Sequence, residues 1–150
     1  MISNKSNAGD SLAASHILAT CRTVAVVGLS PKPHRDSYHV ASYMQAQGWR
    51  IVPVNPVVAA SGERILGEVV YASLTEAAGH QTIDLVDVFR NSLDVPPIVD
   101  EAIVLKLPAL WLQLGVRHDE AVAKARAAGL QVVQDQCLLV AHQRQARQQG

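Results

Sequence analysis

The sequence has few cysteines and few aromatic residues, and neither sign of charge is in excess; each shortage excludes a class of protein. Its two cysteines, Cys21 and Cys137, are too few for a disulfide scaffold, so we expect two reduced thiols. Aromatic residues make up 4% of the chain, which leaves no stacking platform for single-stranded nucleic acid. The 13 basic residues balance 13 acidic ones, whereas a nucleic-acid binder usually carries a basic excess.

Signals for membranes and export are also missing. No apolar run approaches the roughly 20 residues that cross a bilayer, and residues 1–20 lack the apolar segment of a signal peptide. We therefore expect a cytoplasmic protein, a monomer or a homodimer, that binds neither membrane nor nucleic acid. At 150 residues, with 49% hydrophobic residues, one domain is expected over 10–142, between a flexible tail (1–9) and a polar tail (143–150).

Apolar segments of strand length alternate with segments of helical pattern along this domain. The strands are predicted at 23–28, 50–54, 84–89, 109–114 and 131–134. The helices are predicted at 10–20, 37–47, 73–79, 95–105 and 118–128, and from Cys137 onward. Such alternation is typical of βαβ units. The predicted fold is a Rossmann-like three-layer α/β/α domain with a mainly parallel sheet of five or six strands.

Local signals mark where these helices begin and end. The candidate N-cap residues are Asp10 or Ser11, Asp36 or Ser37, and Ser73, which forms a capping box with Glu76. Gly48 is expected to close the second helix in the left-handed conformation. Residues 57–67 are interpreted as a loop, followed by a short extended piece at 68–71.

The first predicted strand leads into a corner that favours phosphate. It ends at Gly28, and a polar segment (30–37) precedes the next helix, whose N-terminus attracts anions. The dinucleotide fingerprint G-x-G-x-x-G is incomplete, because Ser30 and Pro33 stand at its other glycine positions. The second strand ends in Asn55 instead of the carboxylate that binds an NAD ribose. The corner therefore predicts a phosphorylated ligand but not a standard NAD site.

Basic residues gather where the predicted strands end, although the whole chain is neutral. They are Lys32, Arg35, Arg90 and Arg117. Since parallel strands end at one edge of a sheet, this segregation favours a polyanionic small molecule. The alternative is that arginine and lysine simply favour exposed loops.

Four short motifs in sequence order make a resemblance specific. They are GLSPKP at 28–33 with Arg35 and Ser37, VNP at 54–56, DVFR at 87–90, and WLQLG at 111–115. Over residues 15–142 the chain resembles the small stand-alone CoA-binding proteins, which are similar to the CoA-binding domain of succinyl-CoA synthetase alpha subunits. The resemblance implies that coenzyme A or an acyl-CoA binds at the sheet edge. Ligase activity is not expected, because the synthetase's phosphorylated histidine belongs to a second domain.

The resemblance also implies roles for individual residues. The phosphate loop would be formed by Gly28, Ser30, Lys32, Arg35 and Ser37. The adenosine would lie against Asn55 and Pro56, and the pantetheine arm against Phe89, Arg90 and Gln113, with Gly115 and Cys137 completing the site. Some relatives carry Asp-Arg-Cys where this chain has Asp135-Gln136-Cys137, so any role of that arginine is lost here.

A catalytic interpretation is less well supported than a binding one. Cys137 with His118 or His142 is the candidate nucleophile and base, and histidine spacing gives no support for zinc or another metal. Asp84 and Asp87 flank a strand, where acidic residues more often cap loops than form a pair. Trp111 is expected in the core. We therefore favour a non-catalytic binding or regulatory protein. The alternatives are an NAD-type nucleotide sensor or small thiol oxidoreductase using Cys137, or a partner subunit with a decayed ligand site.

Overall fold

The centre of the protein is a five-stranded, wholly parallel sheet. The structure, a computed structural model, describes residues 2–149; Met1 and Gly150, which belong to the two predicted tails, lie outside this range. The sheet order is β2-β1-β3-β4-β5, and every neighbouring pair is parallel. The strands are β1 (Thr23–Val27), β2 (Arg50–Val54), β3 (Leu85–Val88), β4 (Ala109–Leu112) and β5 (Gln131–Val133). The predicted Rossmann-like fold is confirmed.

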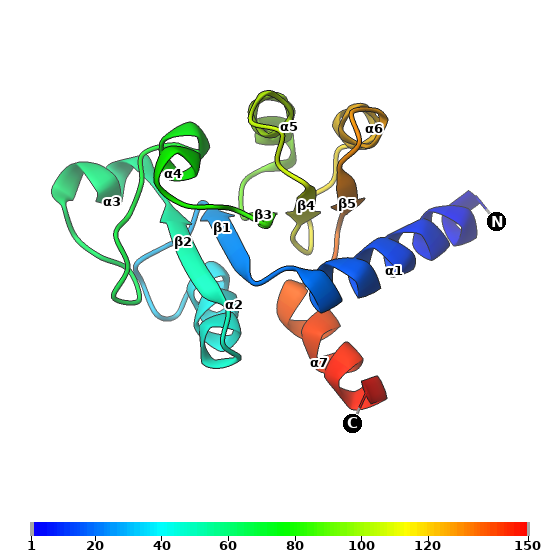
Figure 1. Ribbon diagram of the computed structural model, residues 1–150, viewed down its shortest axis with the longest axis horizontal. Helices are drawn as coiled ribbons and strands as arrows, with labels where there is room; N and C mark the ends of the chain where they lie inside the picture. Colours follow the sequence, from blue (N-terminus) through cyan, green and yellow to red (C-terminus); the bar gives the residue numbers. More distant parts are fainter. Residues whose placement is uncertain (1, 150) are drawn as a thin grey trace.

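Helices cover both faces of this sheet (Figure 1). The helices are α1 (Ile2–Thr20), α2 (Asp36–Ala46), α3 (Pro56–Ser61), α4 (Leu74–His80), α5 (Val95–Val104), α6 (Asp119–Ala127) and α7 (Leu138–Gln149), with a 3-10 turn η1 (Ser92–Asp94). Helices α1, α2 and α7 lie on one face and α4, α5 and α6 on the other. No helix within residues 2–149 has the length and apolar character needed to cross a membrane.

The strands are apolar on both sides because each face is buried under helices. In β1, Val24 and Val26 pack toward α1, α2 and α7, whereas Ala25 packs toward α4, α5 and α6. Trp111 in β4 is fully buried on the first of these faces, and its Nε1 donates to the Gln136 carbonyl at 2.9 Å. The expected core position of Trp111 is therefore confirmed.

The chain reverses its direction of travel through the sheet between β1 and β3. From β1 it passes through α2 to β2, and from β3 it passes through α5 to β4 on the opposite face. The segments that follow β1 and β3 therefore continue to opposite faces of the sheet. Open α/β sheets bind their ligands at such a point.

Several local signals act as predicted. The Ser73 hydroxyl oxygen accepts a hydrogen bond from the Glu76 N–H at 3.0 Å, which confirms Ser73 as the N-cap of α4. Gly48 has a φ of 92° directly after α2, in the left-handed region that glycine tolerates. Within residues 2–149 the extended piece near Tyr71 makes only isolated bridges, so no sixth strand forms there.

Helix α3 occupies the first part of a predicted loop, and α1 extends into the predicted N-terminal tail. Residues 57–67 were expected to form a loop, but α3 begins at Pro56 because Asn55 Oδ1 accepts from the N–H groups of Val57 and Val58, at 3.0 and 3.2 Å. Gly62, with a φ of 76°, ends this helix. At the N-terminus, α1 already begins at Ile2, well before the predicted caps. Flexibility of residues 1–9 stays a prediction, as do the domain boundaries.

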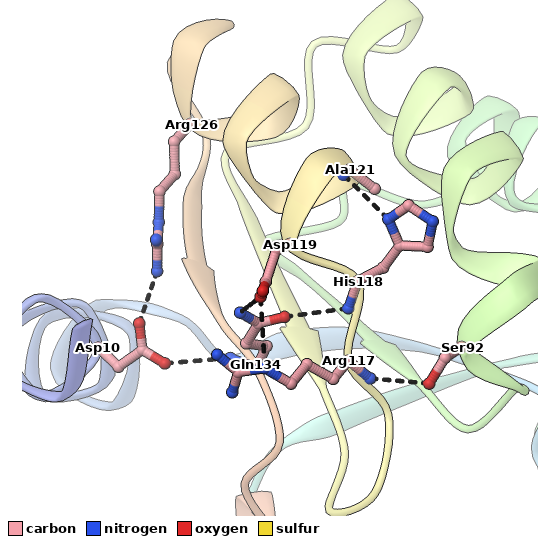
Figure 2. A network of polar contacts seen from close by, with 8 residues as sticks. All are labelled: Asp10, Ser92, Arg117, His118, Asp119, Ala121, Arg126 and Gln134. Carbon is pink, nitrogen blue, oxygen red and sulfur yellow. Dashed lines mark hydrogen bonds and ion pairs between the residues drawn. The ribbon is translucent and has the colours of Figure 1, made fainter. Parts of the chain in front are cut away.

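The expected cap Asp10 is instead a buried carboxylate within α1 (Figure 2). It accepts from Arg126 Nη2 at 2.5 Å and from the Gln134 backbone N–H at 3.4 Å, which joins α1 to α6 and β5. Gln134 continues the network by donating to Asp119 and by accepting from the His118 N–H. Asp10 therefore holds α1 against the edge strand β5 through these hydrogen bonds.

We expect Asp10→Ala to lower the free energy of unfolding by about 1–2 kcal/mol, because it removes the acceptor of two hydrogen bonds and a buried anion. Asp100→Ala is the matched control. Its ion pair with Lys124, at 2.7 Å, is more than half exposed on both sides and should contribute less than about 1 kcal/mol. Urea unfolding measures both variants, and equal losses would contradict the role given to Asp10.

Candidate functional site

Two adjoining hollows lie at the carboxyl edge of the sheet. The smaller, which we call the cradle, has a volume of about 420 Å³ and is lined by Gly28, Ser30, Lys32, Arg35, Asp36, Ser37 and Phe89. The larger, the main cavity, has a volume of about 1040 Å³. Gly28, Asp36 and Phe89 line both, so the two hollows adjoin at these residues. Every residue predicted for the phosphate loop lines the cradle.

The cradle is shaped by hydrogen bonds between its own serines and backbone. The Ser30 N–H donates to Ser37 Oγ at 3.0 Å, and the Lys32 N–H donates to Ser30 Oγ at 3.1 Å. The expected cap of α2 is therefore wrong: Arg35 stands at the N-cap position without a side-chain bond, and the Ser37 hydroxyl holds the loop instead. Lys32 and Arg35 remain exposed at the start of α2, where the helix dipole also favours an anion.

Glycine is required at position 28 for two independent reasons. Its φ of 89° lies in the left-handed region. A Cβ atom there would stand 2.4 Å from the carbonyl oxygen of Phe89, far inside van der Waals contact. The loop after β1 therefore approaches the loop after β3 as closely as two backbones can.

The main cavity brings together residues predicted from the segments that follow all five strands. Those predicted for the site are Gly28, Asn55, Pro56, Phe89, Arg90, Gln113 and Cys137. Sequence reasoning missed the apolar walls that α2, α3 and α7 supply: Val40, Val57, Val58, Leu139 and Val140. Helical periodicity marks such side chains as apolar but does not say whether they face the core or a cavity.

Asn55 reaches the cavity wall, but its polar atoms are largely occupied by the protein. Its Oδ1 caps α3, and its Nδ2 donates to the Leu29 carbonyl at 3.0 Å. The side chain thus joins the loop after β1 to the helix after β2. Its expected contact with adenosine stays a prediction, and its observed role is to hold the two loops together.

Charged groups in the main cavity come from the loop after β3 and from α2. Arg90 Nε lies 3.4 Å from Asp94 Oδ2, and both side chains are more than 40% exposed. Exposed pairs of this kind contribute less than about 1 kcal/mol, so a ligand anion can compete for the guanidinium. Asp36 adds a carboxylate where the cradle and the cavity meet.

Asp84, directly before β3, and Asp87, within it, have separate roles. Asp84 behaves as expected for a loop cap, because its Oδ2 accepts from the N–H groups of Arg22 and Thr23 at 2.9 and 3.0 Å. Asp87 does not cap a loop, and it is only 1% exposed in the middle of the sheet. Burial raises its pKa to about 7, against a smaller lowering by the hydrogen bond that it accepts from Gln113.

Cys137 lines the main cavity, while its candidate bases are engaged elsewhere. His118 Nδ1 accepts from the Ala121 N–H at 3.1 Å and caps α6 (Figure 2). His142 Nδ1 lies 2.8 Å from the Tyr43 hydroxyl, and burial lowers the pKa of His142, with a smaller contribution from Arg22. Both cysteines are free thiols. In the part of the chain that is described, no group of three or more His, Cys, Asp and Glu residues could hold a metal ion.

Two predicted residues lie beside the hollows and do not line them. Gly115 has its N–H bonded to Asp135 Oδ1 at 2.8 Å. Arg117 pairs with Asp119, Nε to Oδ1, at 3.3 Å, and its backbone N–H donates to Ser92 (Figure 2). The cationic edge predicted from the sequence therefore reduces to Lys32, Arg35 and Arg90 around the described hollows. A contact of Gly115 with the ligand stays a prediction.

Comparisons with known proteins agree with the motifs. Residues 22–143 match a family described as CoA binding domain. The uncharacterized protein YneT of Bacillus subtilis (strain 168) is 38% identical over 126 residues, which cover 84% of this chain and 89% of that protein. A solved structure from Thermus thermophilus is 35% identical with a TM-score of 0.82, covering 90% of this chain and 98% of that one. A hypothetical protein from Pyrococcus horikoshii OT3 is 32% identical with a TM-score of 0.81, covering 91% and 92%.

Proposed function

The chain belongs to the CoA binding domain family, and from this premise we propose that it binds coenzyme A or an acyl-CoA as a non-catalytic binding or regulatory protein. The observation that carries the proposal is that the two hollows adjoin. A cationic cradle lies beside a larger chamber with apolar walls, and Gly28, Asp36 and Phe89 line both. Coenzyme A has two parts that match these hollows: a phosphorylated adenosine for the cationic cradle, and a long, less polar arm for the main cavity.

The residues of the cradle fit a diphosphate. Lys32 and Arg35 supply positive charge at the start of α2, whose first N–H groups have no acceptor within the helix. Gly28 allows the loop after β1 to pack against the Phe89 carbonyl, which a side chain at position 28 would prevent. The diphosphate would therefore bind in the cradle and direct the arm into the main cavity.

The main cavity fits the arm. Its volume of about 1040 Å³ is at the upper end of typical ligand pockets. Val40, Val116 and Leu139 line it with apolar surface, while Arg90 and Gln113 add polar groups. Cys137 also lies in this wall, so a thiol or acyl end of the ligand would have room beside it.

Calorimetric titration with CoA tests the proposal. We expect heat of binding that fits a single site, with acetyl-CoA as a second ligand to test tolerance of an acyl group. Absence of binding by both at high micromolar concentration would overturn the proposal.

We expect the double variant Lys32→Ala/Arg35→Ala to bind CoA at least about tenfold more weakly, because each charge-assisted hydrogen bond to phosphate contributes about 1.5–3 kcal/mol. The loss should shrink as salt is raised, since both side chains are exposed. Lys124→Ala is the matched control, an exposed lysine on α6 outside both hollows. An equal loss in Lys124→Ala would show that net charge, and not the cradle, sets the affinity.

A further inference from the structure

Asp87 and Gln113 form a buried polar pair at the base of the main cavity. In the sheet register Asp87 lies between Val26 of β1 and Trp111 of β4, so its neighbours on both adjoining strands are apolar. Gln113 directly follows β4 and is 4% exposed, yet it is part of the cavity wall. Its Nε2 donates to Asp87 Oδ1 at 2.8 Å.

This hydrogen bond fixes which end of the Gln113 amide faces the protein. With Nε2 turned to Asp87, the carbonyl oxygen Oε1 points the other way. Within residues 2–149 no protein donor bonds this oxygen, and no fully buried side-chain nitrogen or oxygen lacks a partner. Oε1 is therefore not sealed in the core, and the open space that Gln113 borders is the main cavity.

We infer that Gln113 Oε1 accepts a hydrogen bond from an amide N–H of the ligand's arm, and that Asp87 is the positioning residue that holds this acceptor in place. The inference rests on the proposed function. It adds the chemical feature that the cavity recognises, a secondary amide. The pantetheine arm contains two such amides, and an amide N–H that leaves water without an acceptor costs about 1–3 kcal/mol.

The surroundings of the pair make a purely structural role a poor explanation. Val40, Val116 and Leu139, on the same cavity wall, have no side-chain acceptor to offer an arm amide. A carboxyl group that is 1% exposed between Val26 and Trp111 costs folding free energy, and an apolar residue there would avoid that cost. An oriented acceptor beside an apolar wall is what an amide-bearing ligand requires.

The test compares two probes that differ only in the arm: CoA, and 3′-phosphoadenosine 5′-diphosphate, which retains the phosphates and adenosine. We expect Gln113→Met to weaken CoA binding about tenfold, the effect of one lost hydrogen bond, and to leave the nucleotide within about twofold. Asp87→Leu should also weaken CoA binding about tenfold and leave the nucleotide within about twofold, because the Gln113 side-chain amide loses the acceptor that holds it in place. Asp87→Asn keeps an acceptor for Gln113 Nε2 and should bind CoA within about twofold of the unmodified protein.

Each outcome decides between the inference and its alternatives. A loss for CoA alone, with rescue by Asp87→Asn, supports the amide contact, because a general loosening of the fold would weaken both probes. Equal weakening of both probes, or unchanged CoA binding in Gln113→Met, overturns the inference and leaves the proposed function intact. If the unmodified protein binds neither probe, the proposed function fails and the inference fails with it. Thermal unfolding of each variant confirms folding, and Gln113→Met decides the matter if Asp87→Leu does not fold.

Discussion

Gly28→Ala is expected to lower the free energy of unfolding by about 3 kcal/mol or more and to abolish CoA binding. Two costs add: a left-handed φ of 89° in a residue with a side chain, about 1–2 kcal/mol, and a Cβ placed 2.4 Å from the Phe89 carbonyl oxygen. The second cost can be relieved only by separating the loops after β1 and β3. Those loops join the cradle to the main cavity, so relief of the clash would deform the binding site itself.

Gly48→Ala is the matched control for this variant. Gly48 has nearly the same φ, 92°, but a Cβ there would meet nothing within 4 Å. We expect it to lose only the backbone cost of about 1–2 kcal/mol and to retain CoA affinity. Urea unfolding and calorimetry on both variants separate the two costs. Equal stability losses, with CoA binding retained in both, would contradict the close approach assigned to Gly28.

The second large effect concerns pH and Asp87. Its pKa in the folded protein is raised from an ordinary value of 3.8 to about 7, because burial disfavours the charged form. Below pH 3.8 the carboxyl is protonated in both the folded and the unfolded state, and folding carries no penalty from it. As the pH rises toward 7 the unfolded chain releases this proton first. The free energy of unfolding therefore falls, by as much as about 4 kcal/mol for this group above pH 7.

Asp87→Asn removes this titration. The fall in the free energy of unfolding that the Asp87 carboxyl causes as the pH rises should therefore be absent from the variant. The asparagine side chain itself changes the free energy of unfolding by an amount that does not depend on pH. The diagnostic quantity is therefore the slope, against pH, of the difference in the free energy of unfolding between the two proteins. We expect the stability of Asp87→Asn relative to the unmodified protein to increase from pH 4 to about pH 7 and to level off above it. Urea unfolding across this range measures it. Parallel stability curves for the two proteins would show that Asp87 does not carry the raised pKa.

Much of the sheet could be predicted from sequence because parallel strands buried on both faces are nearly continuous apolar runs. Residues 24–27 and 85–88 are such runs, interrupted only by Asp87. Ser73 could be recognised as a cap because its partner, Glu76, is three residues away. In each case the interaction that decides the structure lies within one short segment.

Asp10 and Asp87 are misassigned because the residues that decide their environment lie far along the chain. Asp10 is of a residue type that often caps helices, but its partners Arg126 and Gln134 are 116 and 124 residues away. The same holds for Asp87, which a local pattern cannot distinguish from the loop-capping Asp84. Its burial follows from the β1 and β4 neighbours that the sheet order supplies. The α7 wall of the cavity also depends on packing across the whole domain.

The sequence by itself determined the order of strands and helices, the glycine corner after the first strand and the identity of the family. These depend on hydrophobic periodicity, on the backbone freedom of glycine and on motifs read along the chain. Only the tertiary structure decided that the cradle and the main cavity adjoin, that Arg117 lies beside them and pairs with Asp119, and that Gln113 donates a hydrogen bond to Asp87. Distances between segments are set by packing, and no local pattern contains them.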